Sequence, residues 1–175
     1  METDASRTVL GLGGGCHWCT EAVFESLAGV ASVEQGHFRS DPPHEAWSEG
    51  ARVAFDERRL PLGVLLEVHL RTHASTSAHS FRERYRSAVY AGDGTVATRV
   101  RAELARLQPG FDAPLVTRVL ADRGFRESPP EFRGYYRTGP DRPFCRTYID
   151  PKLARLRRDF AGHLRARPGP APPAP

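Results

Sequence analysis

The chain has 175 residues, of which 39% are hydrophobic and 26% charged, and its formal net charge is +4. These values indicate one globular domain and exclude a chain that is disordered throughout. The basic residues are scattered without a stripe of interleaved aromatics, so nucleic-acid binding is not expected. The sequence shows no long apolar run and no signal peptide, so we expect no membrane span and a cytoplasmic protein.

Hydrophobic periodicity predicts strands and helices that follow one another along the chain. The strands are expected at residues 8–12, 30–35, 49–55, 85–90 and 114–121. The helices are expected at residues 17–28, within 56–73, at 95–107 and at 152–164. Residues 36–46 and 74–83 read as polar loops, and residues 124–150 show no clear period. This succession favours an α+β fold built as a two-layer α/β sandwich.

The two ends of the chain lack the pattern of a packed structure. Residues 1–7 are polar and expected to be flexible. The Pro-rich tail at residues 165–175 has no apolar face to bury and is expected to be disordered. We therefore assign residues 8–164 to a single domain, which carries the catalytic residues discussed below.

Two cysteines near the start of the chain have the spacing of a reactive pair. Cys16 follows three glycines at the point where a strand leads into a helix, and there the helix N-terminus stabilises a thiolate. Cys19 lies one helical turn later and could close a disulfide with it. The alternatives are an inert buried thiol or half of a zinc site. Because Cys145 stands alone, without a second cysteine pair, we expect no metal.

The run Gly-Gly-Cys-His-Trp-Cys-Thr-Glu at residues 14–21 resembles the signature of the A-class peptide methionine sulfoxide reductases, which act on the S epimer. Residues 85–90 and 131–136 are similar to later segments of that family, in the same order. His17 stands where the family has phenylalanine, and the segment at residues 36–48 is shorter than usual. The resemblance implies a ferredoxin-like core with a mixed sheet, and reduction of methionine sulfoxide in proteins or as the free amino acid.

Sulfoxide reduction needs a nucleophile, an acid near the oxygen and an apolar wall for the methyl group. Cys16 is the expected nucleophile and becomes a sulfenic acid. For the acid we choose Glu49, which shares a strand face with apolar residues and also matches the family's catalytic glutamate. Burial on that face would raise its pKa. Its alternative is a surface carboxylate at the end of the strand.

The remaining site residues are inferred from the resemblance. Trp18 would form the wall for the methyl group, with His17 as a second wall or a polar lip. Tyr136 and Glu131 match the family's donor to the sulfoxide oxygen and its partner acid, although the tyrosine could equally be an ordinary packed aromatic. Glu21 belongs to the signature, but in the first turns of a helix it could simply favour the helix dipole.

Either Cys19 or Cys145 could resolve the sulfenic acid. Cys19 is favoured because the short loop costs little entropy to close. The resemblance implies recycling by thioredoxin or another dithiol, with no other cofactor. The partners expected are oxidised proteins or peptides and this reductant, and the chain is expected to be a monomer.

Two other functions compete with this interpretation. One is a general thiol–disulfide oxidoreductase, although such proteins usually place Trp before the first cysteine and Pro within the pair. The other is an inactive binding module on the same fold, which the altered segments at residues 36–48 and 131–134 would allow. Convergence of Cys16 and a proton donor on one site separates an enzyme from such a module.

Overall fold

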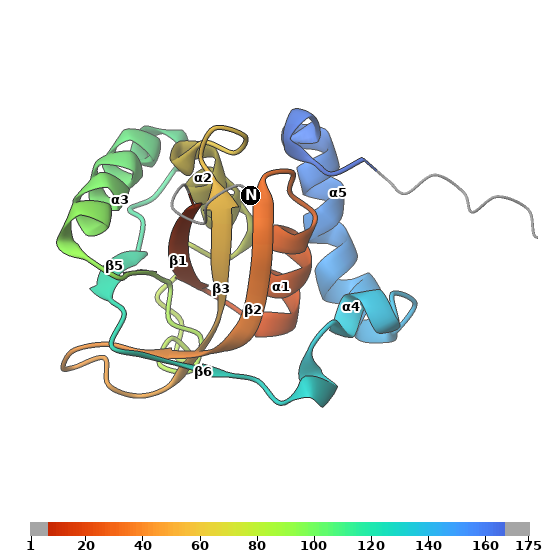
Figure 1. The fold of residues 1–175 in the computed structure, drawn as a ribbon, viewed down its shortest axis with the longest axis horizontal. Helices are drawn as coiled ribbons and strands as arrows, with labels where there is room; N and C mark the ends of the chain where they lie inside the picture. Colours follow the sequence, from red (N-terminus) through yellow and green to blue (C-terminus); the bar gives the residue numbers. More distant parts are fainter. Residues whose placement is uncertain (1–6, 167–175) are drawn as a thin grey trace, which may run out of the picture.

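The computed structural model describes residues 7–166, which form a six-stranded sheet with helices packed against it (Figure 1). The strands are β1 (Arg7–Gly13), β2 (Val30–Arg39), β3 (Ser48–Asp56), β4 (Ala88–Ala91), β5 (Arg118–Ala121) and β6 (Gly124–Glu127). The helices are α1 (His17–Glu25), α2 (Leu62–Thr72), α3 (Gly94–Leu107), α4 (Tyr135–Thr138) and α5 (Asp150–Asp159). A π-helical turn (Cys145–Ile149) leads directly into α5.

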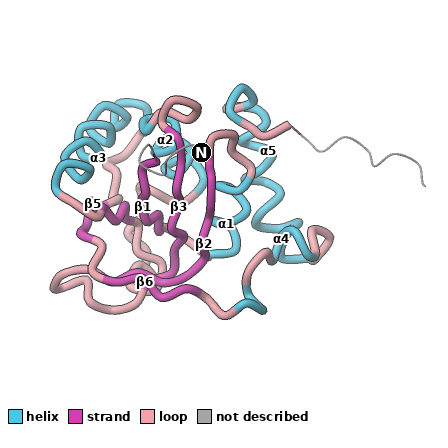
Figure 2. The backbone as a smooth tube through the Cα atoms, viewed as in Figure 1, coloured by secondary structure: helices cyan, strands magenta, loops and turns pink. Residues whose placement is uncertain are grey.

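The sheet is mixed, with the strand order β5-β4-β1-β3-β2-β6. Strands β4 and β5 run parallel, and every other neighbouring pair is antiparallel. Helices α1 and α2 lie behind the central strands in the view of Figure 1, and the tube in Figure 2 shows the same two layers. The predicted α+β class and the mixed sheet are therefore confirmed.

Strand β3 places Glu49 on the sheet face that packs against the helices. Its residues Ala51, Val53 and Phe55 are fully buried, whereas the intervening Arg52 and Ala54 are partly exposed. This is the alternation expected of a strand with one covered face. Glu49 continues the covered row and is 4% exposed. Because β3 pairs antiparallel with β1, Glu49 lies next to the point where β1 leads into α1.

Strand β2 is longer than the sequence indicated. The expectation of a loop at residues 36–46 is wrong for its first four residues, all of which pair with β6, and the first three of which also pair with β3. Gly36 permits this double pairing, because a Cβ at that position would lie 2.3 Å from the carbonyl oxygen of Arg126 in β6. The glycine that looked like a loop residue is therefore a point of close approach between strands.

The other differences concern the ends of elements. The first helix ends at Glu25, since Leu27 forms an isolated β-bridge with Leu164 instead of a further helical turn. Arg165, assigned to the disordered tail, donates its backbone N–H to Ser26 O at 2.9 Å and its Nε to Glu25 O at 2.9 Å. Residues 1–6 and 167–175, the rest of the expected flexible ends, lie outside the described residues.

Several strands and helices are displaced from the expected ranges. The strand expected at 114–121 covers only its last four residues, and the final helix spans Asp150–Asp159 instead of 152–164. The aperiodic region 124–150 contains the edge strand β6, the short helix α4 and the π-helical turn, all too short for a periodic signal. Within residues 7–166, none of the helices has the length and apolar character needed to cross a membrane.

Candidate active site

Cys16 occupies the N-cap position of α1, at the junction with β1. Its carbonyl oxygen accepts hydrogen bonds from the backbone N–H groups of Cys19 and Thr20, both at 3.1 Å, so the first turn forms directly after it. The chain reaches this position through Gly14, where a Cβ would lie 2.4 Å from the imidazole ring of His73. Glycine at that point therefore lets the backbone pass the ring and leaves the half-buried Cys16 thiol accessible.

Hydrogen bonding makes Cys16 a thiolate at neutral pH. Its pKa is lowered from 9.0 to about 5, mainly by the hydrogen bond from the Cys19 side chain, with help from His17 and the backbone N–H of Trp18. Burial and the Glu49 carboxylate act in the opposite direction. The pKa of Cys19 is raised, because its proton is held by Cys16 and its own burial disfavours a second charge. The pair thus contains one nucleophile and one protonated donor.

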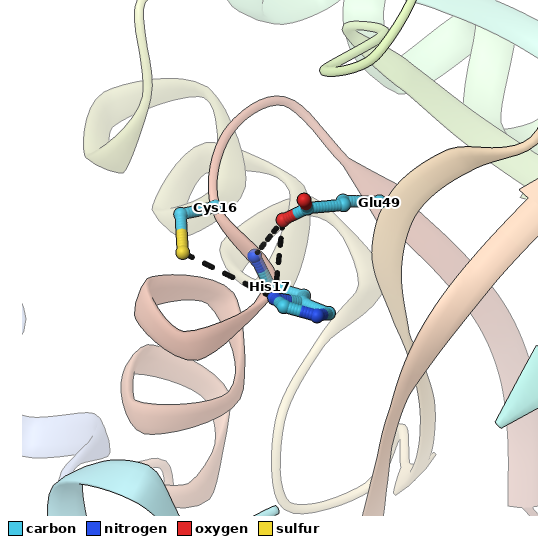
Figure 3. Close-up of side chains that lie close together, drawn as sticks. All are labelled: Cys16, His17 and Glu49. Atoms are coloured by element: carbon cyan, nitrogen blue, oxygen red, sulfur yellow. Dashed lines mark hydrogen bonds and ion pairs between the residues drawn. The ribbon is translucent and has the colours of Figure 1, made fainter. Parts of the chain in front are cut away.

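Glu49 lies beside Cys16 and contacts His17, as Figure 3 shows, and it also contacts Arg84. Its Oε2 accepts the His17 backbone N–H at 3.1 Å and lies 3.1 Å from His17 Nδ1. Its Oε1 accepts Nε and Nη2 of Arg84, both at 3.2 Å. His17 Nδ1 is also 4.0 Å from Cys16 Sγ. The thiol, the imidazole and the carboxylate thus converge, with their ligand atoms within 4.8 Å of one another.

This arrangement corrects the sequence interpretation of Glu49 in one respect. The carboxyl is buried as expected, but its surroundings are not apolar, because Arg84 and His17 both contact it. Sequence reasoning missed Arg84, which falls between the loop expected at residues 74–83 and the strand expected at residues 85–90 and was given no role. The only sequence signal for it was its position directly before the family-like segment at residues 85–90.

Trp18 is packed between aromatic rings. Its indole stacks on Tyr135 with ring centroids 4.0 Å apart and an interplanar angle of 5°, and Phe144 meets it edge-on at 5.4 Å. His17 lies near it with centroids 5.9 Å apart. The tyrosine of helix α4 therefore covers an indole face that the sequence interpretation left open for the methyl group.

Cys16 also lines a cavity of about 280 Å³, to which His17 and Glu49 do not contribute. Among its lining side chains are Cys19, Phe144, Tyr148, Tyr85 and Lys152. Burial raises the pKa of Tyr85 and keeps its phenol protonated. The pKa of Lys152 is lowered by burial, while the charges of the two thiols act to raise it. None of these aromatic residues or the lysine was assigned to the site from the sequence.

Two expected substrate residues are placed elsewhere. Glu131 is exposed, and Tyr136 donates its hydroxyl to Asp150 Oδ1 at 2.9 Å. Neither belongs to the lining of the cavity beside Cys16. Adjacent residues of a helix point about 100° apart, so in α4 it is Tyr135 that faces Trp18. The structure thus brings Cys16, Cys19, His17, Trp18 and Glu49 together but does not bring Glu131 and Tyr136 to them.

Glu21 is inside the protein and does not serve the helix dipole. It is 4% exposed, and its Oε2 accepts Nε2 of Gln35 at 2.8 Å. Its Oε1 accepts the backbone N–H of Gly134 at 2.9 Å. The same Gln35 Nε2 also donates to Phe132 O at 2.9 Å. The signature glutamate therefore fastens the segment before α4 to α1 and so positions Tyr135 against Trp18.

Cys145 begins the π-helical turn that precedes α5. It is fully buried, and its thiol donates to Gly139 O at 3.4 Å. Burial raises its pKa, so it stays protonated and unreactive at neutral pH. All three cysteines of the chain are free thiols, and of the two candidate partners Cys19 is the one that contacts Cys16.

The geometry agrees with comparisons with known proteins. Residues 8–164 match the family model "Peptide methionine sulfoxide reductase". The methionine sulfoxide reductase MsrA of Ralstonia nicotianae is 34% identical, with 94% of this chain and 96% of that protein covered. MsrA of Thermus thermophilus is 30% identical over 88% and 96% of the two chains.

Solved structures show the same fold. Reduced Mxr1 from Saccharomyces cerevisiae has a TM-score of 0.70 at 17% identity, covering 85% of this chain and 94% of that chain. Methionine sulfoxide reductase A of Corynebacterium diphtheriae has a TM-score of 0.66 at 19% identity, covering 80% and 78%. With a family match over nearly its whole length and a thiolate cysteine in the family's signature, the chain belongs to the peptide methionine sulfoxide reductases, a family of oxidoreductases.

Proposed function

We propose that this chain reduces the S epimer of methionine sulfoxide, in proteins and as the free amino acid, with Cys16 as the nucleophile. The observation that carries the proposal is the thiolate of Cys16, held by Cys19 on one side and flanked by the His17–Glu49 pair on the other. An inert thiol or an inactive binding module would not need an activated sulfur next to an acid–base pair.

The reaction begins when the Cys16 thiolate attacks the sulfur of the sulfoxide. The oxygen takes up one proton and passes to the cysteine, so that methionine leaves and Cys16 becomes a sulfenic acid. Methionine sulfur is thereby reduced by two electrons and the cysteine sulfur is oxidised by two. Cys19 then attacks the sulfenic sulfur, a disulfide forms, and the hydroxyl leaves as water with the Cys19 proton.

Glu49 and His17 supply the proton to the sulfoxide oxygen in this proposal. His17 Nδ1 lies 3.1 Å from Glu49 Oε2 and 4.0 Å from Cys16 Sγ, so the pair is close to the oxygen of a sulfoxide whose sulfur is attacked by Cys16. Tyr85 lines the cavity as a protonated phenol and offers a hydrogen bond to the same oxygen. Phe144 and Tyr148 provide the apolar surface for the methyl group.

The disulfide is returned to the dithiol by a thioredoxin-type reductant, without a prosthetic group. A relative of the same fold, Mxr1 from Saccharomyces cerevisiae, is known in complex with Trx2; it has a TM-score of 0.57 and 17% identity over 77% of this chain and 88% of that chain. Three free thiols suit a reducing compartment, which supports an enzyme that works in the cytoplasm.

The test uses both epimers of an N-acetylated methionine sulfoxide with a thioredoxin recycling system. Only one epimer can present its sulfur to Cys16 while its oxygen meets the donors, so we expect roughly 10³-fold preference for S. Comparable rates, or a preference for R, would contradict the proposal.

The resolving cysteine is tested separately. Cys19→Ser should release one methionine per chain and then stop, whereas the matched Cys145→Ser should turn over repeatedly. The reverse pattern would assign resolution to Cys145.

A further inference from the structure

Three different metal-binding groups converge at the start of α1. They are the Cys16 thiolate, the His17 imidazole and the Glu49 carboxylate, and Figure 3 shows all three pointing toward one space. His17 Nδ1 is 3.1 Å from Glu49 Oε2 and 4.0 Å from Cys16 Sγ. Two of the ligands are adjacent in the sequence, and the third comes from β3. The set therefore depends on the fold and could not be found from a spacing pattern.

The His17 ring nitrogen can form a hydrogen bond with only one of its two neighbours in this cluster. The nitrogen faces both the sulfur and the carboxylate oxygen, and it carries either one proton or one lone pair. A cation placed between the three atoms would accept one lone pair from each of them.

The distances suit a tetrahedral ion. Bonds of 2.0–2.3 Å to zinc place tetrahedral ligand atoms about 3.3–3.6 Å apart. The nitrogen–oxygen and nitrogen–sulfur separations here are 3.1 and 4.0 Å, and all three atoms lie within 4.8 Å of one another. For all three atoms to bind one ion, the sulfur has to move closer to the other two, through rotation about the Cα–Cβ bond of Cys16.

The surroundings also orient the carboxylate. Arg84 holds Glu49 Oε1 through two hydrogen bonds of 3.2 Å, which turns Oε2 toward the imidazole. Such outer contacts fix the direction of a metal ligand. A thiolate with an imidazole and a carboxylate favours Zn²⁺ over the hard cations Mg²⁺ and Ca²⁺, which prefer oxygen ligands.

We propose that the reduced chain binds one Zn²⁺ ion through Cys16 Sγ, His17 Nδ1 and Glu49 Oε2, in competition with the sulfoxide. The ion masks the nucleophile without changing its oxidation state. Three protein ligands leave the fourth position to water, so the ion stays exchangeable. His17 is the residue that distinguishes this chain from the phenylalanine in the signature it resembles, and phenylalanine offers no ligand.

Zinc titration of the reduced chain tests this site without any sulfoxide present, so its outcome is independent of the proposed reductase activity. The full chain is kept oxygen-free with a phosphine reductant, and Zn²⁺ affinity is measured by competition with a chromophoric chelator. We expect one ion per chain, and an affinity at least ~10²-fold weaker in His17→Phe and in Glu49→Gln, since even outer contacts of a zinc site contribute 10–100-fold. Zinc should also protect Cys16 from iodoacetamide in the wild type but not in His17→Phe.

Two variants serve as matched controls. Cys145→Ser removes a buried thiol outside the site, and His44→Phe makes the same imidazole-to-phenyl change at a distant loop; both should bind zinc like the wild type. Circular dichroism establishes that His17→Phe is folded, and His17→Gln replaces it if it is not. Loss of binding in Cys145→Ser as large as in His17→Phe, retention in both His17 and Glu49 variants, or no stoichiometric binding would overturn the proposal.

Discussion

The two sides of Cys16 differ in chemistry and in origin. On the polar side, Glu49 is held by His17 and Arg84; its carboxylate raises the pKa of Cys16, whereas the hydrogen bond from His17 lowers it. On the cavity side, Cys19 donates the hydrogen bond that creates the thiolate, and the Lys152 cation interacts favourably with it. The largest stabilisation of the nucleophile therefore comes from the cavity side, while the polar side carries the two groups that we propose to protonate the sulfoxide oxygen.

The largest effect is expected from the residue that both sides share. Cys16→Ser should lower sulfoxide reduction by roughly 10⁴-fold or more, because a serine hydroxyl stays protonated at neutral pH and cannot attack the sulfur. Measurement of methionine release in a single turnover checks this without any contribution from recycling. Cys145→Ser, which removes a buried thiol outside the cavity, should leave that single turnover intact.

The polar side is tested by Glu49→Gln. We expect the reductase step to slow by about 10²-fold, the usual effect of losing a positioned proton donor, while iodoacetamide alkylation of Cys16 changes far less. Single-turnover rates and alkylation rates of the same preparation separate the two effects. Glu131→Gln, which changes an exposed glutamate, provides the matched control and should leave the rate of the reductase step unchanged. If both variants slowed this step equally, Glu49 would have no special role as proton donor.

The cavity side is tested by the pH dependence of alkylation. With a pKa of about 5, Cys16 should stay reactive from pH 8 to pH 6 and lose reactivity as the pH falls through about 5. In Cys19→Ala the donor is gone, and a hydrogen bond to a charged group contributes roughly 1.5–3 kcal/mol, so the midpoint should rise by about one to two pH units. Cys145→Ala should keep the wild-type profile. An unmoved midpoint in Cys19→Ala would assign the thiolate to His17 and the helix terminus.

The smallest effect concerns the apolar surface of the cavity. Phe144→Ala should raise KM about fivefold, equivalent to roughly 1 kcal/mol of lost apolar contact with the substrate, and leave kcat nearly unchanged. Steady-state kinetics with a peptide substrate provide both constants. Phe132→Ala, which truncates an exposed phenylalanine, should leave KM at the wild-type value. A fall in kcat alone would move Phe144 from substrate binding to the support of Trp18.

The features that depend only on neighbouring residues in the chain could be predicted from the sequence. The glycines, Cys16 and the helix behind it lie within one short run, so the thiolate at a helix N-terminus followed from residue types alone. The burial of Glu49 followed from the alternation of β3, which depends only on the period of a strand. Both are properties that neighbouring residues decide.

The contacts between distant segments were not predictable in the same way. Nothing in the sequence states that Arg84 reaches Glu49, or that Tyr135 instead of Tyr136 covers Trp18, because each depends on how an irregular segment packs against the sheet. The segment at residues 124–150 is divided into pieces too short for periodicity. The path of this segment is set by its contacts with buried residues elsewhere in the fold, such as Glu21, which accepts the backbone N–H of Gly134.

The buried bond between Glu21 and Gly134 has a consequence for synthesis of the protein on the ribosome. The two residues are 113 positions apart, so the signature leaves the ribosome long before its partner segment exists. Until then Gln35 can bond only Glu21 Oε2, and closing the core over the carboxylate would leave Oε1 without a hydrogen bond, a cost of about 1–3 kcal/mol or more. In the nascent chain, the face of α1 that carries Glu21 is therefore expected to stay exposed to water until Gly134 has been synthesised. The first part of the site to be synthesised is thus the last to be completed.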